Sequence, residues 1–270
     1  MKKFTVSSVV PFVTVIVLLY CSTLFAGIPT QPNTLYYGKD SGSNEQYTLS
    51  NGWTVPNQTI MVGGEGTASF THTSGTVQGI TLLTMGYAQG GQGYWTQSGG
   101  AMNSGITVVA SGGIAQYTQN AGTNTMTALG VGQNDLAHYS TAVGGQGEYQ
   151  LNGGTLNIGQ IFLGDAAGCR GNFVMTDGEL IMSGGINVNS TYGQFSMSGG
   201  LFKTSYYTPI GLTNLFNTTL QHTGEVIIGT EGQYTTAYVV PEPCSILLLG
   251  IGLFAYKFYH HTGKRQCRGC

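Results

Sequence analysis

The sequence has 270 residues, of which 44 are glycine and only 7% are charged, and its formal net charge is −2. Between residues 28 and 240 there are three basic and ten acidic side chains, so this part has a net charge of −7 that the basic ends conceal. Such an acidic segment cannot neutralise phosphates, which excludes nucleic acid as a partner. The length allows one or two domains, and the regular recurrence of apolar and aromatic residues argues against a disordered chain.

The N-terminal residues have the pattern of a secretory signal peptide. Two lysines precede an apolar stretch over 9–25, and the small residues Ala26 and Gly27 offer a cleavage site. We expect a signal peptide at 1–26, followed by a lead-in or cap at 27–44. An uncleaved N-terminal anchor is the alternative, because the apolar stretch is longer than a usual signal core.

The central part of the chain is a repeat in which an aromatic residue is followed five positions later by glycine. EYQLNGG, NFVMTDG and QFSMSGG are three of the copies. Successive aromatic residues are 22–25 positions apart, except for one step of 32 that we interpret as an inserted loop at 138–147. The seven aromatic residues are Tyr47, Phe70, Trp95, Tyr117, Tyr149, Phe173 and Phe195, and an eroded eighth copy follows at 220–228.

Within each copy the residues alternate with a period of two. The aromatic residue and the residue two positions later share one face, and the residues between and before them are mostly polar, as on a strand with one buried side. The glycine permits the positive φ that a tight turn needs. A second short strand follows, as at 155–158, and often a third, as at 160–163.

Three short strands with tight turns in each copy predict an all-β fold, a parallel β-solenoid of about seven to eight coils over 45–238. A single coil cannot bury its own apolar face, whereas stacked coils form a continuous core. At about 4.8 Å per coil, eight coils form a rod about 40 Å long, with the aromatic residues stacked as a ladder. Helical periodicity is absent from this part. The segment YQLNGGTLN at 149–157 resembles autotransporter-type repeats.

The segment 239–270 combines three features. Pro241, Glu242 and Pro243 come directly before the apolar stretch SILLLGIGLFAY, and basic residues follow it. The prolines keep the tripeptide extended, and the apolar stretch is shorter than the about 20 residues of a full bilayer span. By the positive-inside rule the basic end stays cytoplasmic. An apolar segment alone would indicate an ordinary tail anchor.

This combination resembles the PEP-CTERM sorting signal. The resemblance implies that an exosortase, a membrane transpeptidase, recognises the motif and removes the tail. The sequence departs from the usual pattern at Cys244, where serine or threonine is more common, and in the long tail after the first basic residue. The implied route is export across the inner membrane of a Gram-negative-type bacterium, transient anchoring by a short C-terminal transmembrane helix, and delivery to the cell surface or extracellular matrix.

The sequence offers weak candidates for a reaction centre. Parallel β-helices include polysaccharide lyases and hydrolases, which need clustered acids and bases. Asp177 and Glu179 are the best carboxylate pair, but they flank a turn glycine, which favours an exposed turn. His72, His138 and His222 lie on different copies without the spacing of metal ligands. We therefore expect no enzyme activity, no cofactor and no metal site.

Two binding interpretations stay open. The aromatic ladder could stack on sugars, although its inward partners favour a core role. Thr48, Thr71, Thr96 and Thr118 form a row that could lie flat and bind ice, and some ice-binding proteins carry a similar C-terminal signal; the row breaks at Gln150. Our first expectation is a structural or adhesive surface protein associated with exopolysaccharide or biofilm matrix. The alternatives are a carbohydrate- or ice-binding solenoid and, less favoured, a polysaccharide lyase or hydrolase.

Overall fold

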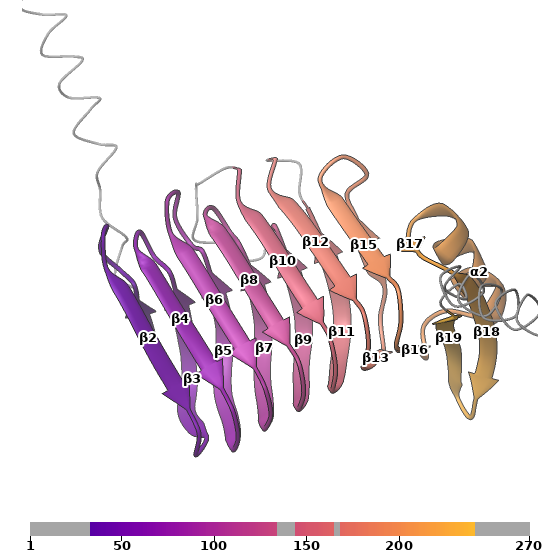
Figure 1. The fold of residues 1–270 in the computed structure, drawn as a ribbon, viewed down its shortest axis with the longest axis horizontal. Coiled ribbons are helices and arrows are strands. Elements are labelled where there is room, and N and C mark those ends of the chain that lie inside the picture. Colours follow the sequence, from indigo (N-terminus) through magenta and orange to yellow (C-terminus); the bar gives the residue numbers. More distant parts are fainter. Residues whose placement is uncertain (1–32, 134–143, 165–167, 241–270) are drawn as a thin grey trace, which may run out of the picture.

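The computed structural model describes residues 33–133, 144–164 and 168–240. These residues form two long sheets that wind around a common core, which confirms the predicted all-β parallel solenoid of about seven turns. In Figure 1 the coils follow one another along the rod, from the indigo N-terminal part to the orange C-terminal part.

The first sheet contains the first strand of each coil, and we call it the ladder sheet. Its strands are all parallel, and each pairs with the strands of the coils before and after it. In chain order they are β2 (Asn44–Leu49), β4 (Thr67–His72), β6 (Gln92–Gln97), β8 (Ile114–Gln119), β10 (Gln146–Leu151), β12 (Arg170–Met175), β15 (Gly193–Met197) and the short β17 (Gln221–His222).

The second sheet forms the rest of each coil. Its strands are β1 (Thr34–Tyr37), β3 (Trp53–Val62), β5 (Thr76–Met85), β7 (Ala101–Val109), β9 (Thr123–Val131), β11 (Thr155–Leu163), β13 (Glu179–Met182), β16 (Leu201–Thr204), β19 (Tyr234–Val240) and β18 (Glu225–Glu231), with β14 (Ile186–Val188) beside β11.

In each of the coils that contain β3, β5, β7, β9 and β11, the predicted second and third strands form one long strand. In the coil after β11 they are the separate strands β13 and β14. Irregular register between β3, β5 and β7 marks the corner of the coil. At this corner Gly79 has a φ of +84°, and a Cβ there would meet the carbonyl oxygen of Val55. Pairing resumes after the corner, so the chain bends without ending the strand.

Glycine is required in the turn after each ladder strand. Gly122 and Gly154 have φ angles of +83° and +76°, as the repeat predicted. A Cβ on Gly122 would meet the carbonyl oxygen of Gly100, and one on Gly154 would meet that of Gly122. Any other residue would be strained in its own backbone and would press against the neighbouring coil.

Inward side chains of both sheets form one continuous apolar core. The rings of Phe70 and Trp95 are 2% and 0% exposed, and the four later rings of the ladder are fully buried, whereas Tyr47 at the N-terminal end is 37% exposed. The residues two positions after the rings are also buried, from His72 to Met197. The predicted alternation of inward and outward residues is therefore present in the structure.

A helix that we did not predict covers the C-terminal end of the core. Helix α2 (Pro209–Thr218) buries Leu212 and Phe216, so the expectation that helical structure is absent was wrong at this point. Thr208 caps the helix, because its Oγ1 accepts a hydrogen bond from the Gly211 amide at 3.2 Å, and Pro209 occupies the first turn. Because this helix has only ten residues and occurs once, it is not part of the repeat from which the other elements were predicted.

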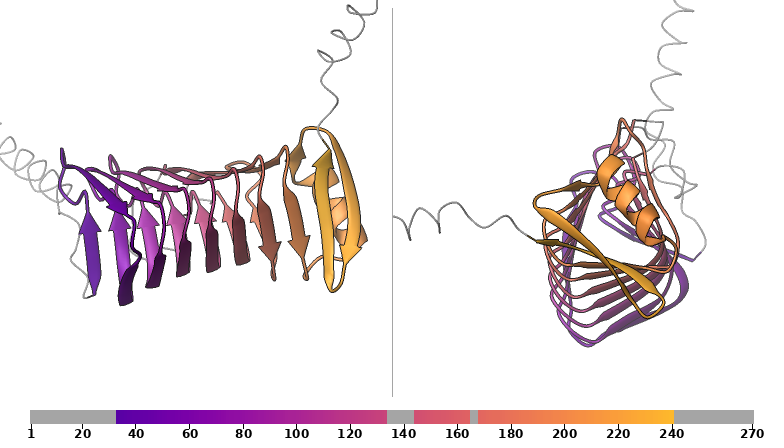
Figure 2. Two further views of the ribbon diagram at one scale, coloured as in Figure 1. Left: turned by 60° about the horizontal axis from the view of Figure 1, so that its bottom comes forward. Right: turned by 90° about the vertical axis from the view of Figure 1, so that its right-hand side faces the viewer.

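The eighth copy of the repeat does not form a full coil. It contributes the short β17 to the ladder sheet and then continues into β18 and β19, which form an antiparallel hairpin. Strand β19 also runs antiparallel to β16. Figure 2 shows this hairpin and α2 lying across the end of the solenoid, so the C-terminal part of the predicted repeat domain is a cap.

Several predictions lie outside the described residues. These are the signal peptide with Ala26 and Gly27, the sorting motif at 241–243, the apolar C-terminal segment and most of the inserted loop at 138–147. Within the described ranges, no helix combines the length and the hydropathy that a membrane crossing requires.

Candidate functional site

The aromatic ladder lies inside the solenoid. Neighbouring rings from Tyr47 to Phe195 have centroids 4.7–6.1 Å apart and planes inclined by 3–22°. Only the ring of Tyr47, at the end of the stack, is substantially exposed. The ladder therefore belongs to the core and presents no continuous surface on which a sugar could stack.

Polar side chains inside the core hold two rings of the ladder. Tyr117 donates a hydrogen bond to Gln97 Oε1 at 2.9 Å, and Tyr149 donates one to Gln119 Oε1 at 2.7 Å. Asn124 Nδ2 donates to both phenol oxygens, at 2.9 Å each. Burial raises the pKa of both phenols above the ordinary value, so the two side chains stay neutral and serve a structural role.

The candidate carboxylate pair is divided between two local contacts. Lys203 Nζ lies 2.9 Å from a carboxylate oxygen of Glu179 and 2.9 Å from one of Glu231, which joins the last coils to the cap. Asp177 Oδ1 instead accepts a hydrogen bond from the Gly178 amide at 2.8 Å. The two side chains therefore do not share a substrate-facing position as an acid–base pair would.

The histidines are also apart. His72 is buried with Nε2 3.1 Å from the Ser74 carbonyl oxygen, whereas His222 lies exposed near the cap. His138 lies outside the described residues. Over the ranges that the structure describes, no three His, Cys, Asp or Glu side chains gather closely enough to hold a metal ion.

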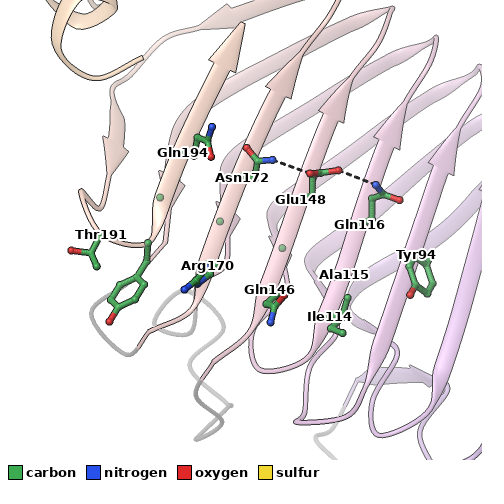
Figure 3. A pocket seen from close by; sticks show the side chains of 14 residues that line it. Tyr94, Ile114, Ala115, Gln116, Gln146, Glu148, Arg170, Asn172, Thr191 and Gln194 are labelled. Carbon is green, nitrogen blue, oxygen red and sulfur yellow. Dashed lines mark hydrogen bonds between the residues drawn. The ribbon is translucent and has the colours of Figure 1, made fainter. Parts of the chain in front are cut away.

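A shallow groove of about 520 Å³ lies on the outer face of the ladder sheet (Figure 3). It crosses β6, β8, β10, β12 and β15, a distance of about 19 Å at the usual spacing of paired strands. We call it the sheet groove. Because the strands are in register, equivalent positions of successive coils form straight rows along it.

The central row of the sheet groove contains the residue that precedes each ladder ring. Its members are Tyr94, Gln116, Glu148, Asn172 and Gln194, one on each strand. Glu148 Oε1 accepts a hydrogen bond from Gln116 at 3.0 Å, and its Oε2 accepts one from Asn172 at 2.8 Å, as Figure 3 shows. The three central members of the row are thus linked, with one carboxylate between two amides.

Arg170 supplies the positive charge of the groove, beside Gln146 in the neighbouring row. The other two bases of the described residues are engaged elsewhere, since Lys203 pairs with two glutamates and Lys39 lies over the ring of Tyr36. Among the described residues Arg170 forms no ion pair. Among the described residues that line the groove, Glu148 is the one carboxylate, and its charge balances that of Arg170.

The described residues of the sheet groove offer groups that can bind a ligand. Two of the described residues that line the sheet groove, Arg170 and Glu148, are charged, whereas a polysaccharide lyase or hydrolase needs clustered acids and bases. It offers amide donors and acceptors on successive strands and a tyrosine at one end. Sequence reasoning missed this row because its residues are 22–32 positions apart and look like ordinary solvent-facing side chains.

The threonine row is formed on the same outer face. Thr48, Thr71, Thr96 and Thr118 are in register on four neighbouring strands. The row ends at Gln150, whose Oε1 lies 3.5 Å from the Thr118 hydroxyl. The row beside it is the mixed polar row of the sheet groove, so the threonines form a single line rather than a wide array.

No protein-family model matches the sequence, and the comparisons with curated proteins and with solved structures found no match.

Proposed function

We propose that this protein is an exported, non-enzymatic surface or matrix protein that holds a polysaccharide chain in the sheet groove. The observation that supports the proposal is the central row, which repeats hydrogen-bonding side chains on five successive strands. A polymer that lies along the rod meets one hydrogen-bonding side chain of this row on each coil. This suits a ligand whose own chemistry repeats, such as a polysaccharide.

The chemistry of the row matches sugar hydroxyls. An amide side chain both donates and accepts, so Gln116, Asn172 and Gln194 can pair with hydroxyls in either orientation. Tyr94 adds an aromatic ring against which the C–H face of a pyranose can pack. Because Arg170 and Glu148 balance in charge, the groove does not require an acidic polymer.

The cellular destination of the protein is proposed from the resemblance of its C-terminal segment to the PEP-CTERM sorting signal. The motif Pro241-Glu242-Pro243 is the signal that an exosortase recognises, and removal of the apolar tail releases the solenoid from the inner membrane. The protein then joins the cell surface or the exopolysaccharide matrix of a biofilm.

The groove is tested by cosedimentation of the protein with the exopolysaccharide fraction of the producing bacterium. We expect the double variant Tyr94→Ala/Gln116→Ala to lose most of the bound fraction. Gln78→Ala is the matched control, because Gln78 is an exposed amide of the second sheet. Equal binding of all three proteins would overturn the proposal.

The cellular destination is tested separately, by mass spectrometry of the mature C-terminus of the protein from fractions of the producing cells. We expect the native chain to end near Pro241–Pro243 and to be found at the surface or in the medium. Glu242→Ala should keep the tail and stay in the inner-membrane fraction. A native chain that retains Cys270 in the membrane would instead be a tail-anchored solenoid.

Ice binding is the second candidate, favoured by the in-register row of Thr48, Thr71, Thr96 and Thr118. Regular hydroxyl and methyl groups on a flat strand face can order water. The measurement is the growth of ice crystals in the presence of the protein and of Thr71→Lys. Inhibition that the lysine abolishes would support this function, and equal crystal growth with and without protein would end it.

A further inference from the structure

A second groove, of about 540 Å³, lies where β11 and β14 meet the segment before α2 and α2 itself. Strand β14 belongs to the second sheet, and the turn at 189–192 separates it from β15 of the sheet groove. We call it the Tyr206 groove. Its lining residues that matter here are Gln160, Phe162, Asn187, Tyr206, Tyr207 and Thr219.

The ring of Tyr206 is exposed, yet it is held in position. It is 61% exposed, and it stands at 90° to the ring of Tyr207 with centroids 4.9 Å apart. Thr204 Oγ1 accepts hydrogen bonds from the amides of both tyrosines, at 3.0 and 3.4 Å. The Tyr207 hydroxyl accepts one from the Ile186 amide at 3.0 Å. A Cβ on Gly185 would lie 3.4 Å from Tyr206 Cε1, so the ring edge rests against bare backbone.

The backbone of Tyr206 is held by Thr204 and its exposed ring packs edge to face against Tyr207, so the ring loses less freedom on binding than an unsupported side chain would. The face of the ring is apolar, so a flat ligand with an apolar side can cover it and remove it from water. The neighbouring amides of Gln160 and Asn187 supply donors and acceptors beside the ring.

The charge of the groove restricts the ligand. No acidic or basic side chain is among the described residues that line it. A nucleic acid or an acidic polymer would find no cation there. A pyranose ring fits both halves of the lining, because its C–H face can stack on an aromatic ring while its hydroxyls bond to amides.

We propose that the Tyr206 groove binds a pyranose residue of a neutral polysaccharide, stacked on Tyr206 and hydrogen bonded by Asn187 and Gln160. The inference rests on the proposed function for the class of ligand, and it adds a second site on the other sheet. A protein with two such sites can hold two polysaccharide segments at once, and thereby cross-link a matrix.

The test is isothermal titration of the full chain with neutral hexasaccharides: β-1,4-glucan, β-1,3-glucan, α-1,4-glucan and β-1,4-mannan. We expect at least one of them to occupy two sites in the native protein. Tyr206→Ala should weaken one site about tenfold, while Tyr206→Phe, which keeps the ring, should stay within about twofold of the native affinity. Thermal unfolding of Tyr206→Ala is the check on the fold, and we expect a native-like midpoint because the ring is mostly exposed.

Tyr94→Ala separates this inference from the proposed function, because it changes only the sheet groove. If Tyr206→Ala binds like the native protein while Tyr94→Ala loses binding, the Tyr206 groove is not a sugar site and the proposed function stands. If only Tyr206→Ala loses binding, the sheet groove is not the sugar site. If none of the four hexasaccharides binds the native protein, both proposals are overturned.

Discussion

Asn124 bridges two successive rings of the ladder, because its Nδ2 lies 2.9 Å from the hydroxyl oxygens of both Tyr117 and Tyr149. The two rings stack with their centroids 4.8 Å apart and their planes inclined by 9°. The residues in register with Asn124 on the neighbouring strands are Met102 and Leu156. A single amide in an otherwise apolar row therefore satisfies two buried phenol groups.

Asn124→Leu is expected to lower the free energy of unfolding by about 2 kcal/mol, because two buried hydroxyls lose their donor. Urea denaturation followed by circular dichroism measures the change. Asn103→Ala, an exposed asparagine of β7, is the control and should have little effect. A native-like Asn124→Leu would show that the bridge is not stabilising.

Stability should decrease in alkaline solution. The pKa values of Tyr117 and Tyr149 are raised above 10.0 by burial, so the folded protein keeps both phenols neutral while the unfolded chain ionises near pH 10. Their contribution is therefore complete below pH 10 and is lost as the pH rises above it. Unfolding free energies measured across this range should fall less steeply in Tyr117→Phe/Tyr149→Phe. An unchanged slope in the double variant would contradict this explanation.

Tyr47 should titrate differently from the buried tyrosines. Its hydroxyl donates a hydrogen bond to Glu45 at 2.7 Å, and this bond is the main cause that raises the pKa of Tyr47 to about 12. Because the ring is at the exposed end, it can ionise without unfolding. The measurement is a pH titration of Glu45→Gln, followed by the near-ultraviolet absorbance of phenolate. One tyrosine should then have a lower pKa than in the native protein. A curve identical to that of the native protein would argue against the bond.

The cost of removing a ladder ring should depend on its place in the stack. Phe173→Ala should destabilise the protein by about 3–5 kcal/mol, because the ring is fully buried between Tyr149 and Phe195. Tyr47→Ala should cost less, since Tyr47 is 37% exposed and stacks on only one ladder ring. The denaturant midpoints of the two variants measure this difference in stability. Equal losses of stability would contradict the prediction that the contribution of a ring depends on its position in the stack.

Two glycine substitutions separate backbone strain from crowding between coils. Gly90 has a φ of +89° with open space around its Cβ position, so Gly90→Ala should cost only the about 1–2 kcal/mol of a left-handed alanine. Gly122→Ala has the same strain and also meets the carbonyl oxygen of Gly100. It should therefore be clearly less stable than Gly90→Ala in thermal unfolding. Similar stabilities would show that the coils can separate without cost.

The repeated features of the fold were predictable from the sequence. Parallel coils in register place equivalent residues above one another, so the same aromatic residue and the same glycine return in each copy. The corner within the second sheet was not predictable in detail, because a bend such as that at Gly79 leaves pairing intact on both sides. The cap was missed because α2 and the hairpin occur once and have no period.

The sheet groove could not be recognised along the chain. Gln116, Glu148 and Asn172 become neighbours only when coils stack, and each alone looks like a solvated residue. The hydrogen bonds between them depend on side-chain geometry that spacing does not encode. The same holds for Asn124, since its position in other copies is occupied by apolar residues such as Leu156.

The antiparallel hairpin at the cap also disfavours end-to-end pairing of rods. A parallel stack that ends in a bare coil is a template for another molecule, as in cross-β assemblies. At the C-terminal end, β19 reverses the strand direction, and the outer strand β18 carries the exposed carboxylates of Glu225 and Glu231. At the other end, Glu45 occupies a row that continues with Ala68. Charge on the terminal strands β2 and β18 therefore disfavours pairing of these strands with those of another molecule.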